Sequence, residues 1–416
     1  MHIWYVHPYG GGPGIGLYDR PFRLARAWQE QGHSATVFIA RFHHLLDRHE
    51  PLAPALDVEG VRYVTIPARS YTQKNGLARI LNMWDFSRNL YAAGQRYGTD
   101  VPQPDAIVLS SPHPFAIFPA YRLARRYSAK LVFEVRDIWP LSVTEVLGAS
   151  PMHPFVRMCA MAERFALTRS DLVASVMPRM DRYLADRGYG SKPFIWVPNG
   201  LDPRRSEEES SLGATARAAL STLSRWETEG YTTLVYAGRL GKPNAVNLLL
   251  EAVSVGVSRG QARDLRVMLV GAGDQYASLK ALTQKHRLDG VCFAGHVAKG
   301  EVASLLRASH IAYAGAKPLD RLYRYGISPN KMADYYAAAL PVLLPMPPCG
   351  DPVSESGGGI ARGTETPEAV WEALSELLIL SPDERRALGE KGKAYMVKEY
   401  DYDRIALRYV EAVAAL

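Results

Sequence analysis

Short runs of β-branched and apolar residues alternate with stretches of helical apolar spacing along almost all of the 416 residues. Such alternation is typical of α/β proteins with parallel sheets. The chain is too long for one ordinary core, so two domains of about 200 residues each are expected. A polar stretch, "RRSEEESSLGATARAA", follows "VPNGLDP" and separates two alternating series. The sequence therefore predicts two open α/β domains, at residues 1–198 and 199–400.

The apolar runs predict the positions of the strands. In the first domain, strands are expected at residues 3–6, 35–39, 61–66, 106–109, 131–135, 172–175 and 195–197. In the second domain they are expected at residues 233–237, 267–270, 291–294, 311–314 and 342–344, with helices beginning near Asn244, Gln275, Lys299, Pro329 and Thr366. Ligands of open α/β sheets bind beyond the carboxyl ends of the strands, so a cleft-binding protein is expected.

A glycine-rich stretch, "GGGPGIG", follows the first expected strand. Its glycines match neither the dinucleotide fingerprint, which needs them at positions i, i+2 and i+5, nor the phosphate loop, which ends in Gly-Lys-Ser/Thr. A backbone without side chains still allows a ligand to approach closely, and a helix N-terminus follows it. A flexible loop is the alternative.

The net charge of +7 is confined to the first half of the chain. Residues 1–198 contain 23 Lys and Arg against 16 Asp and Glu, whereas residues 199–416 contain 26 of each kind. This asymmetry favours an anionic partner, such as a phosphorylated acceptor or an acidic membrane surface, with a solvated basic face as the alternative. The basic residues form no dense runs, so nucleic acid is not expected. Three widely spaced cysteines, no signal peptide and no long apolar segment predict a cytoplasmic protein.

Three strand-to-helix turns of the second domain carry residues suited to a nucleotide. Arg239 and Lys242 in "YAGRLGK" are two cations beside helix N–H groups, which suits a pyrophosphate. In "LVGAGD", Gly271 and Gly273 allow either close packing or the approach of a ligand. In "FAGHV", the backbone at Gly295, His296 and Val297 is placed to contact a base.

The stretch "SPNKMADYY" predicts a helix that begins with ligand-binding groups. Ser328 is expected to cap this helix, and Pro329 to occupy its first position. Asn330 and Lys331 would then face anionic or hydroxyl-rich groups, and Asp334 would accept hydrogen bonds from a ribose diol.

These motifs together resemble glycosyltransferase family 4, whose members have the GT-B fold of two Rossmann-like domains with parallel sheets facing across a cleft. The stretches that carry the resemblance are "RLARAWQEQGHSATVF", "FEVRDIWP", "VPNGLD", "GRLGK", "LVGAGD", "FAGHV" and "SPNKMADYYAAALPVLL", and they span nearly the whole chain in order. "EVRDIWP" with "SPNKMADY" is most similar to the branch that builds bacterial O-antigen and capsule sugars, including N-acetylfucosaminyl transferases.

The resemblance implies a retaining, metal-independent transfer of a sugar from a nucleotide-diphosphate donor, with UDP favoured, to a saccharide or polyprenyl-diphosphate-linked acceptor. No cofactor is expected. Arg239 and Lys242 would contact the donor pyrophosphate, Gly11 and Gly12 would approach it from the other domain, and Asp334 would hold the ribose. Backbone around Ser328–Asn330 would contact the donor sugar and phosphate. The last helix, at about 401–416, would pack back on the first domain.

Two positions depart from the family pattern. The family has two glutamates separated by seven residues, but here the position eight before Asp334 is Gly326. A His-Asp pair common in the mid-domain loop is Arg136-Asp137, which is a candidate catalytic pair or an internal ion pair that supports the loop. His7, Arg20 and His113 are candidate acceptor contacts, although buried structural histidines are common.

Further motifs have simpler interpretations. "DYD" at residues 401–403 is expected to begin the last helix rather than bind a metal, and "HHLLDRH" at residues 43–49 to be a polar loop. A helix in "NGLARILNMWDFSRNLYAAGQRYG" is expected to bury most of its apolar stripe, with an exposed end that faces an anionic membrane and its lipid-linked acceptor. The alternatives to a transferase are a non-hydrolysing nucleotide-sugar epimerase and a non-catalytic nucleotide-sugar binding protein.

Overall fold

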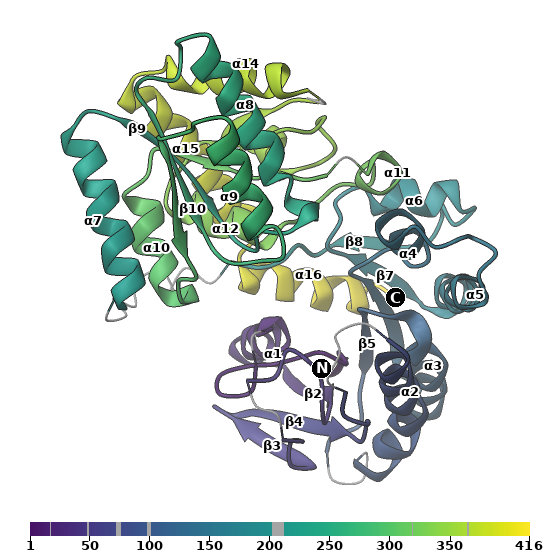
Figure 1. Cartoon of the computed structure of the whole chain (residues 1–416). Helices are drawn as coiled ribbons and strands as arrows, with labels where there is room; N and C mark the ends of the chain where they lie inside the picture. The colour runs from purple at the N-terminus through teal and green to yellow at the C-terminus, as the bar shows by residue number, and fades with distance from the viewer. Residues whose placement is uncertain are drawn as a thin grey trace. The chain divides into compact units, whose positions relative to one another are not determined.

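The computed structural model describes residues 1–16, 18–47, 50–71, 76–97, 101–201, 212–317, 319–363 and 366–416. The chain divides into two compact units (Figure 1). The first unit contains Met1–Gly200, Arg324–Gly326 and Tyr402–Leu416, and the second contains Leu201–Tyr323 and Ile327–Asp401. No helix in the described ranges has both the length and the apolar character needed to span a membrane.

The first unit is built on an eight-stranded sheet with the strand order β3-β4-β2-β1-β5-β6-β7-β8. Its strands are β1 (His2–Val6), β2 (Ser34–Ala40), β3 (Ala55–Val58), β4 (Val61–Ile66), β5 (Ala106–Ser111), β6 (Lys130–Val135), β7 (Leu172–Ser175) and β8 (Phe194–Trp196). Every pair is parallel except β3 and β4, which form a hairpin. The seven predicted strands are present. β3 has no exposed–buried alternation that a pattern could detect, since its residues are exposed or half-exposed throughout.

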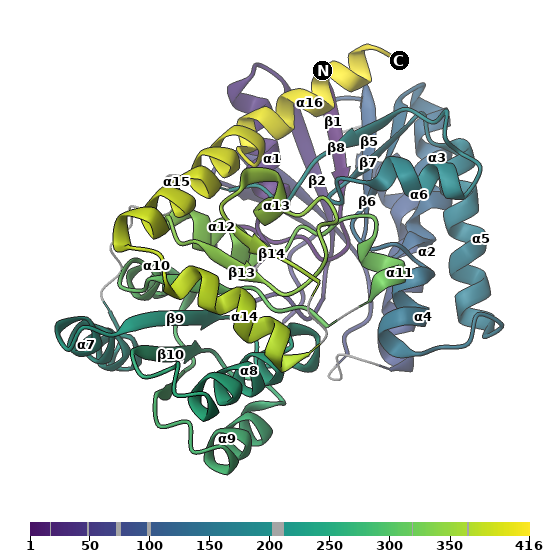
Figure 2. The same ribbon diagram turned by 90° about the horizontal axis from the view of Figure 1, so that it is seen from above.

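Helices cover both faces of this sheet (Figure 2). On one face lie α1 (Arg20–Glu30) and α16 (Tyr402–Ala414), and on the other lie α2 (Leu77–Tyr97), α3 (Ile117–Tyr127) and α5 (Pro154–Arg169). The short helices α4 (Leu141–Leu147) and α6 (Met180–Asp186) follow β6 and β7.

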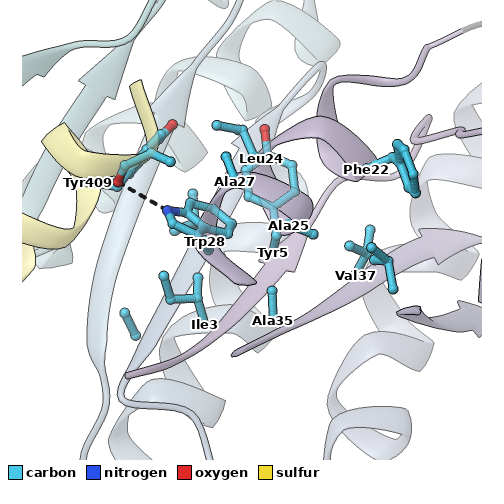
Figure 3. Close-up of a cluster of buried hydrophobic side chains, with 14 of the residues drawn as sticks. Ile3, Tyr5, Phe22, Leu24, Ala25, Ala27, Trp28, Ala35, Val37 and Tyr409 are labelled. Carbon is cyan, nitrogen blue, oxygen red and sulfur yellow. Dashed lines mark hydrogen bonds between the residues drawn. The ribbon is translucent and has the colours of Figure 1, made fainter. Parts of the chain in front are cut away.

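Trp28 explains why α16 belongs to the first unit although it ends the chain. Its side chain is fully buried, and its Nε1–H donates to the carbonyl of Ala406 at 3.1 Å. The ring meets Tyr409 of α16 edge-on at a centroid distance of 5.6 Å and Tyr5 of β1 at 5.9 Å (Figure 3). Burying aromatic rings of this size contributes strongly to a core, so α16 completes this layer.

The second unit is built on a six-stranded parallel sheet with the order β11-β10-β9-β12-β13-β14. Its strands are β9 (Thr232–Ala237), β10 (Leu265–Val270), β11 (Val291–Gly295), β12 (Ile311–Tyr313), β13 (Val342–Leu344) and β14 (Gly359–Ala361). Three helices, α8 (Val246–Ser258), α9 (Tyr276–Lys285) and α14 (Pro367–Leu378), pack on one face of this sheet through a shared hydrophobic core. The remaining helices are α7 (Ala214–Thr228), α10 (Lys299–Arg307), α11 (Asp320–Tyr323), α12 (Asn330–Ala337), α13 (Pro352–Ser356) and α15 (Pro382–Glu399).

The start of α12 differs from the prediction by one residue. Pro329, not Ser328, is the N-cap, with φ −69° and ψ 131°, and the helix begins at Asn330. The residue before a proline is held in an extended conformation, which places Ser328 outside the helix. Likewise, α8 begins at Val246 because a 3₁₀ turn, Lys242–Asn244, comes first.

Candidate active site

The second unit places its predicted donor residues at the carboxyl ends of adjacent strands. The turn after β9 begins at Gly238, the turn after β10 at Gly271, and β11 ends at Gly295. Hydrogen bonds join these turns: the Gly238 N–H donates to Val270 O at 2.9 Å, and the Gly271 N–H donates to Gly295 O at 2.8 Å. The three predicted turns therefore form one surface of this unit.

The glycines of these turns are required by their close approach. A Cβ at Gly271, which has φ +137°, would lie 1.9 Å from Gly238 O, and a Cβ at Gly273 would lie 2.1 Å from Leu240 O. Of the two interpretations left open for Gly271, close packing is therefore found. The backbone at Gly295 also needs glycine, since its φ is +82°. His296 is exposed and Val297 is buried, so His296 is the side chain available to a base.

The turn after β9 is held in place by a chain of hydrogen bonds. Tyr236 Oη and Asn244 Nδ2 donate to Arg239 O at 2.6 and 2.9 Å, and Lys331 Nζ donates to Asn244 Oδ1 at 2.8 Å. Lys331 Nζ also lies 4.6 Å from the centroid of the Tyr236 ring. Burial lowers the pKa of Lys331 to about 8. A partly desolvated cation beside this turn is a strong attractor for a diphosphate.

Arg239 and Lys242 are both exposed. The Arg239 side chain forms an ion pair with Asp274 at 3.0 Å and remains 66% exposed. The contact of Arg239 and Lys242 with a diphosphate stays a prediction, and the half-buried cation beside their turn is Lys331, which reaches it from α12. The sequence analysis does not single out Asn244 and Tyr236, which contact this turn and Lys331, because nothing in their spacing distinguishes them from packing residues.

Asn330 and Asp334 lie one helical turn apart at the beginning of α12, and both are exposed. Residues four apart share one face of a helix, so these two side chains can contact the same ligand. Ser328 and Pro329 are half-buried. These positions suit a ribose and a donor sugar, which stay predictions for Asp334 and for Ser328–Asn330.

The first unit gathers two of its predicted acceptor residues, His7 and His113, at the carboxyl ends of β1 and β5. Tyr9 lies between them, with its ring 6.1 Å from the ring of His113. His7 stacks on Tyr18 at 4.8 Å, and both histidines are almost fully buried. We call His7, Tyr9, Tyr18 and His113 the imidazole cluster.

Five polar atoms of the imidazole cluster have no hydrogen-bond partner among the described residues. Nδ1 of His7 accepts from the Tyr9 N–H at 3.1 Å, which leaves an N–H at the unpartnered Nε2. Both ring nitrogens of His113 and the hydroxyls of Tyr9 and Tyr18 are also buried without a partner among the described residues. Burial, with Arg136 nearby, holds the pKa of His7 well below its usual value, and burial lowers that of His113 to about 3. Buried polar atoms normally have partners, so this cluster fits a ligand rich in hydroxyl groups.

Arg20, predicted as an acceptor contact, is buried in the first unit and paired with groups of the fold. Its guanidinium is 2% exposed and forms an ion pair with Glu134 at 3.1 Å. The remaining N–H groups donate to the carbonyls of Pro198 and Val197. The guanidinium therefore supports Glu134 and the segment that follows β8, and contact of Arg20 with an acceptor stays a prediction.

Arg136 belongs to the same buried network. It donates to Glu134 Oε1 at 3.3 Å and to Asn199 Oδ1 at 2.6 Å, and its guanidinium lies 4.9 Å from the centroid of the Tyr18 ring. The internal ion pair of Arg136 is therefore with Glu134, and Asp137 is exposed. Burial opposes the charge of Glu134, but the two arginines and the Tyr5 hydroxyl outweigh it and lower its pKa.

The glycine-rich loop folds against itself. Gly11 N–H donates to Tyr18 O at 2.7 Å, and Tyr63 Oη donates to Gly11 O at 2.9 Å. A Cβ added at Gly11 would lie 2.6 Å from Gly16 O, and a Cβ added at Gly12 would lie 2.9 Å from Tyr63 Oη. These glycines are required by packing within the first unit, and contact of Gly11 and Gly12 with a donor stays a prediction.

Two histidines of "HHLLDRH", His43 and His44, have structural partners, and His49 lies outside the described residues. His43 is buried, accepts from the Leu45 N–H at 3.3 Å through Nδ1, and bonds Gly10 O at 2.9 Å through Nε2. His44 Nδ1 bonds the Tyr71 hydroxyl at 2.7 Å. Across the residues that the structure describes, no group of three or more His, Cys, Asp or Glu side chains is arranged to hold a metal ion. Asp401 immediately precedes α16, and Asp403 lies in its first turn.

Two family models match the chain. A model described as a glycosyl transferase 4-like domain matches residues 17–200, and a model described as glycosyl transferases group 1 matches residues 231–379. No curated protein matches the sequence.

Solved structures share the fold at low sequence identity. Sucrose-phosphate synthase from Thermosynechococcus elongatus is 16% identical, with a TM-score of 0.71 and 100% of both chains covered. WaaG, a glycosyltransferase involved in lipopolysaccharide biosynthesis, is 17% identical, with a TM-score of 0.62 and 99% of this chain and 98% of that chain covered. HepE of Anabaena, in complex with UDP-glucose, is 14% identical, with a TM-score of 0.64 and 100% of both chains covered. The chain is a glycosyltransferase of the GT-B type, with a 4-like first domain and a group 1 second domain.

Proposed function

We propose that this protein transfers a sugar from UDP to a saccharide or polyprenyl-diphosphate-linked acceptor, with retention of configuration, in the synthesis of a bacterial surface polysaccharide. The proposal of a nucleotide-diphosphate donor rests on the partly buried Lys331 beside the turn after β9. HepE in complex with UDP-glucose and the E. coli trehalose-6-phosphate protein bound with UDP-2-fluoro glucose have this fold and support a UDP-sugar. WaaG supports the role in surface polysaccharides.

The residues suggest how the reaction proceeds without a metal or a cofactor. The bond between the anomeric carbon and the diphosphate breaks, and negative charge grows on the departing phosphate. Lys331, Arg239 and Lys242 stabilise that charge, which is the largest single contribution in many enzymes. The departing phosphate accepts the proton of the attacking hydroxyl on the same face of the sugar. Asp334 holds the ribose, the backbone near His296 faces the base, and the imidazole cluster holds the acceptor.

A donor screen tests this function directly. We expect UDP-sugars, and not GDP- or TDP-sugars, to raise the thermal unfolding midpoint. A ligand at about a hundred times its Kd stabilises by about 2.7 kcal/mol. NMR of the preferred donor with saccharide and lipid-linked acceptors then follows the product. Interconversion of the donor alone would identify an epimerase, and binding without turnover of any acceptor would identify a binding protein.

We further propose that the protein acts at the cytoplasmic face of an anionic membrane. The outer side of α2 exposes Leu77, Ile80 and Trp84, at 71%, 36% and 60%. Exposed arginines flank this stripe on the helices of the same face of the sheet: Arg88 and Arg96 on α2, Arg122, Arg125 and Arg126 on α3, and Arg157, Arg164 and Arg169 on α5. Apolar side chains with flanking arginines are the combination that binds anionic lipid surfaces.

The inner side of α2 contacts the imidazole cluster. The Arg79 guanidinium lies 5.5 Å from the centroid of the Tyr9 ring, and Phe86 meets the His113 ring at 6.3 Å. Asn82 donates to Phe42 O at 3.1 Å and to Arg69 O at 2.7 Å, which fixes this part of the helix. One helix thus carries both the apolar stripe and a wall of the cluster, which favours a lipid-linked acceptor.

Liposome flotation tests the membrane proposal. We expect the protein to float with vesicles that contain anionic lipid and to remain free with neutral vesicles. Trp84→Ser removes an exposed apolar ring, so binding is expected to fall about tenfold. Ile379→Ser is the matched control, because Ile379 is 82% exposed in the second unit. Equal binding to neutral and anionic vesicles would contradict the electrostatic part, and equal losses in both variants would contradict the assignment to α2.

A further inference from the structure

The hydroxyl of Tyr335 lies between two strands of the second unit's sheet. Tyr335 belongs to α12, and its side chain is fully buried. Its Oη accepts from the Ala237 N–H at 3.0 Å, at the end of β9, and donates to Tyr313 O at 3.1 Å, at the end of β12. Ala237 O lies 3.3 Å from the same hydroxyl and is a second acceptor within reach. One side chain of the helix is thus bonded to the carboxyl ends of two neighbouring strands.

These bonds begin where the pairing of the two strands ends. Among the described residues, β9 and β12 pair no further than Val235 opposite Ala312, whereas β9 pairs with β10 as far as Ala237. The Tyr335 hydroxyl therefore takes the place of a backbone partner for Ala237 on the side of β12. Burial raises the pKa of Tyr335, so the hydroxyl keeps its proton and remains a donor. Buried backbone groups need partners, which makes this hydroxyl a fixed link between α12 and the sheet.

Lys331 lies one helical turn before Tyr335 on α12. Residues four apart share one face of a helix, so both side chains point toward the end of β9. The Nζ of Lys331 donates to Asn244 Oδ1 at 2.8 Å and lies 4.6 Å from the centroid of the Tyr236 ring. Tyr236 directly precedes Ala237 in β9. The strand end that Tyr335 binds therefore also carries the ring on which Lys331 lies.

A second face of α12 and the segment after it are packed against α15. A Cβ added at Gly389 would lie 1.7 Å from Ala339 O, and a Cβ added at Gly392 would lie 2.0 Å from Cε1 of Tyr336. The Tyr336 ring is fully buried. Because these contacts leave no room even for a methyl group, α12 has little freedom to move toward α15.

We propose that Tyr335 is a positioning residue for sugar transfer: its hydroxyl fixes α12 against the ends of β9 and β12, so that the Nζ of Lys331 lies beside the turn after β9. Every residue that carries this inference belongs to the second unit. The inference rests on the proposed function, because it takes Lys331 as a cation that stabilises the departing diphosphate. Misplacement of such a group by about 1 Å can cost about a hundredfold in rate.

The test uses the full-length protein with Tyr335→Phe, which keeps the buried ring and removes the hydroxyl. We expect kcat to fall by about ten- to a hundredfold at a temperature where the protein is folded, because α12 loses its bonds to both strands. Thr233→Val is the matched control. It also removes a fully buried hydroxyl, one that lies 2.9 Å from His310 Nδ1 near the opposite end of β9. Both variants are expected to lower the thermal midpoint, but Thr233→Val is expected to keep the wild-type kcat.

A second readout needs no substrate. Protons above the face of an aromatic ring are shifted upfield in NMR spectra, so the ε-methylene signal of Lys331 reports its position over Tyr236. The signal is assigned by its loss in Lys331→Met. We expect the upfield shift to become smaller in Tyr335→Phe and to stay unchanged in Thr233→Val. Should Tyr335→Phe fail to fold, a ring-fluorinated tyrosine at this position weakens acceptance from the Ala237 N–H, and the signal is expected to move in the same direction.

The two readouts separate the possible failures. An unchanged Lys331 signal in Tyr335→Phe would overturn the positioning role whatever the activity of the variant. A displaced signal with the wild-type kcat, or equal losses of kcat in Tyr335→Phe and Thr233→Val, would overturn it as well. A displaced signal in a protein whose wild type binds no nucleotide sugar would overturn the proposed function and leave the placement of Lys331 by Tyr335 standing.

Discussion

Lys331→Met is expected to lower the rate of sugar transfer roughly a hundred- to a thousandfold, which is the usual loss when one preorganised charge at a reacting group is removed. The Nζ of Lys331 donates to Asn244 and lies over Tyr236, beside the turn that would receive the diphosphate. Methionine keeps the apolar stem that packs on Tyr236, so the second unit is expected to stay folded. Steady-state kinetics and UDP titration measure the effect.

Lys285→Met is the control for this prediction. Lys285 is an exposed residue in the last turn of α9, and the same substitution there is expected to leave transfer unchanged. Near-normal turnover in Lys331→Met, together with a large loss in Arg239→Ala and Lys242→Ala, would return the diphosphate contact to the two exposed cations.

The pH dependence of UDP binding gives an independent readout of the same residue. Burial lowers the pKa of Lys331 to about 8, so its ammonium group loses its proton as the pH rises through that value. A bound diphosphate favours the protonated amine, so affinity is expected to be greatest below about pH 8 and to fall above it. Calorimetric titrations from about pH 7 to 9 measure this step, which Lys331→Met is expected to lack.

Arg20→Met is expected to destabilise the first unit by about 3–5 kcal/mol, the usual cost of breaking a buried ion pair from one side. The substitution leaves Glu134, which is fully buried, with Arg136 as its charged partner and the Tyr5 hydroxyl as a hydrogen-bond donor. It also leaves the carbonyls of Val197 and Pro198 without their donor. Native-state hydrogen exchange of the β1 and β6 amides measures the loss in this unit alone.

The double variant Arg20→Met with Glu134→Gln is the control, because it removes the buried charge together with its partner. It is expected to recover part of the lost stability. If Arg20→Met instead kept wild-type exchange and raised only the KM for acceptor, Arg20 would be a substrate contact after all.

The turns of the second unit were largely predictable from local sequence. Gly238, Gly271 and Gly295 occupy backbone conformations with positive φ, and two of the turns approach closely enough to exclude a Cβ. Such positions require glycine, so the pattern marks them directly. The pattern does not say whether a glycine is needed for packing or for a ligand. For Gly271 and Gly273, the packing of one turn on another is enough to explain the glycine.

The roles of charged residues were less predictable. Arg20 and Arg136 are indistinguishable in the sequence from ligand-binding arginines, and only the buried Glu134 between them shows that they serve the fold. The sequence does not distinguish His7 and His113 from His43. Yet His43 has both ring nitrogens bonded, whereas His7 and His113 retain unpartnered ones. The partners of these side chains include residues far away in the sequence, so the spacing of residues along the chain does not predict them.

The sequence by itself determined the α/β class and most of the strands, although it missed β3 and β14, because periodicity and glycine requirements are local properties. Only the tertiary structure decided which cation lies beside the turn after β9, since Lys331 follows that turn by some ninety residues and reaches it from α12. It also decided why Gly326 stands where a glutamate is expected. Pro178 fills the space that a side chain would need, and that contact joins residues far apart in the chain.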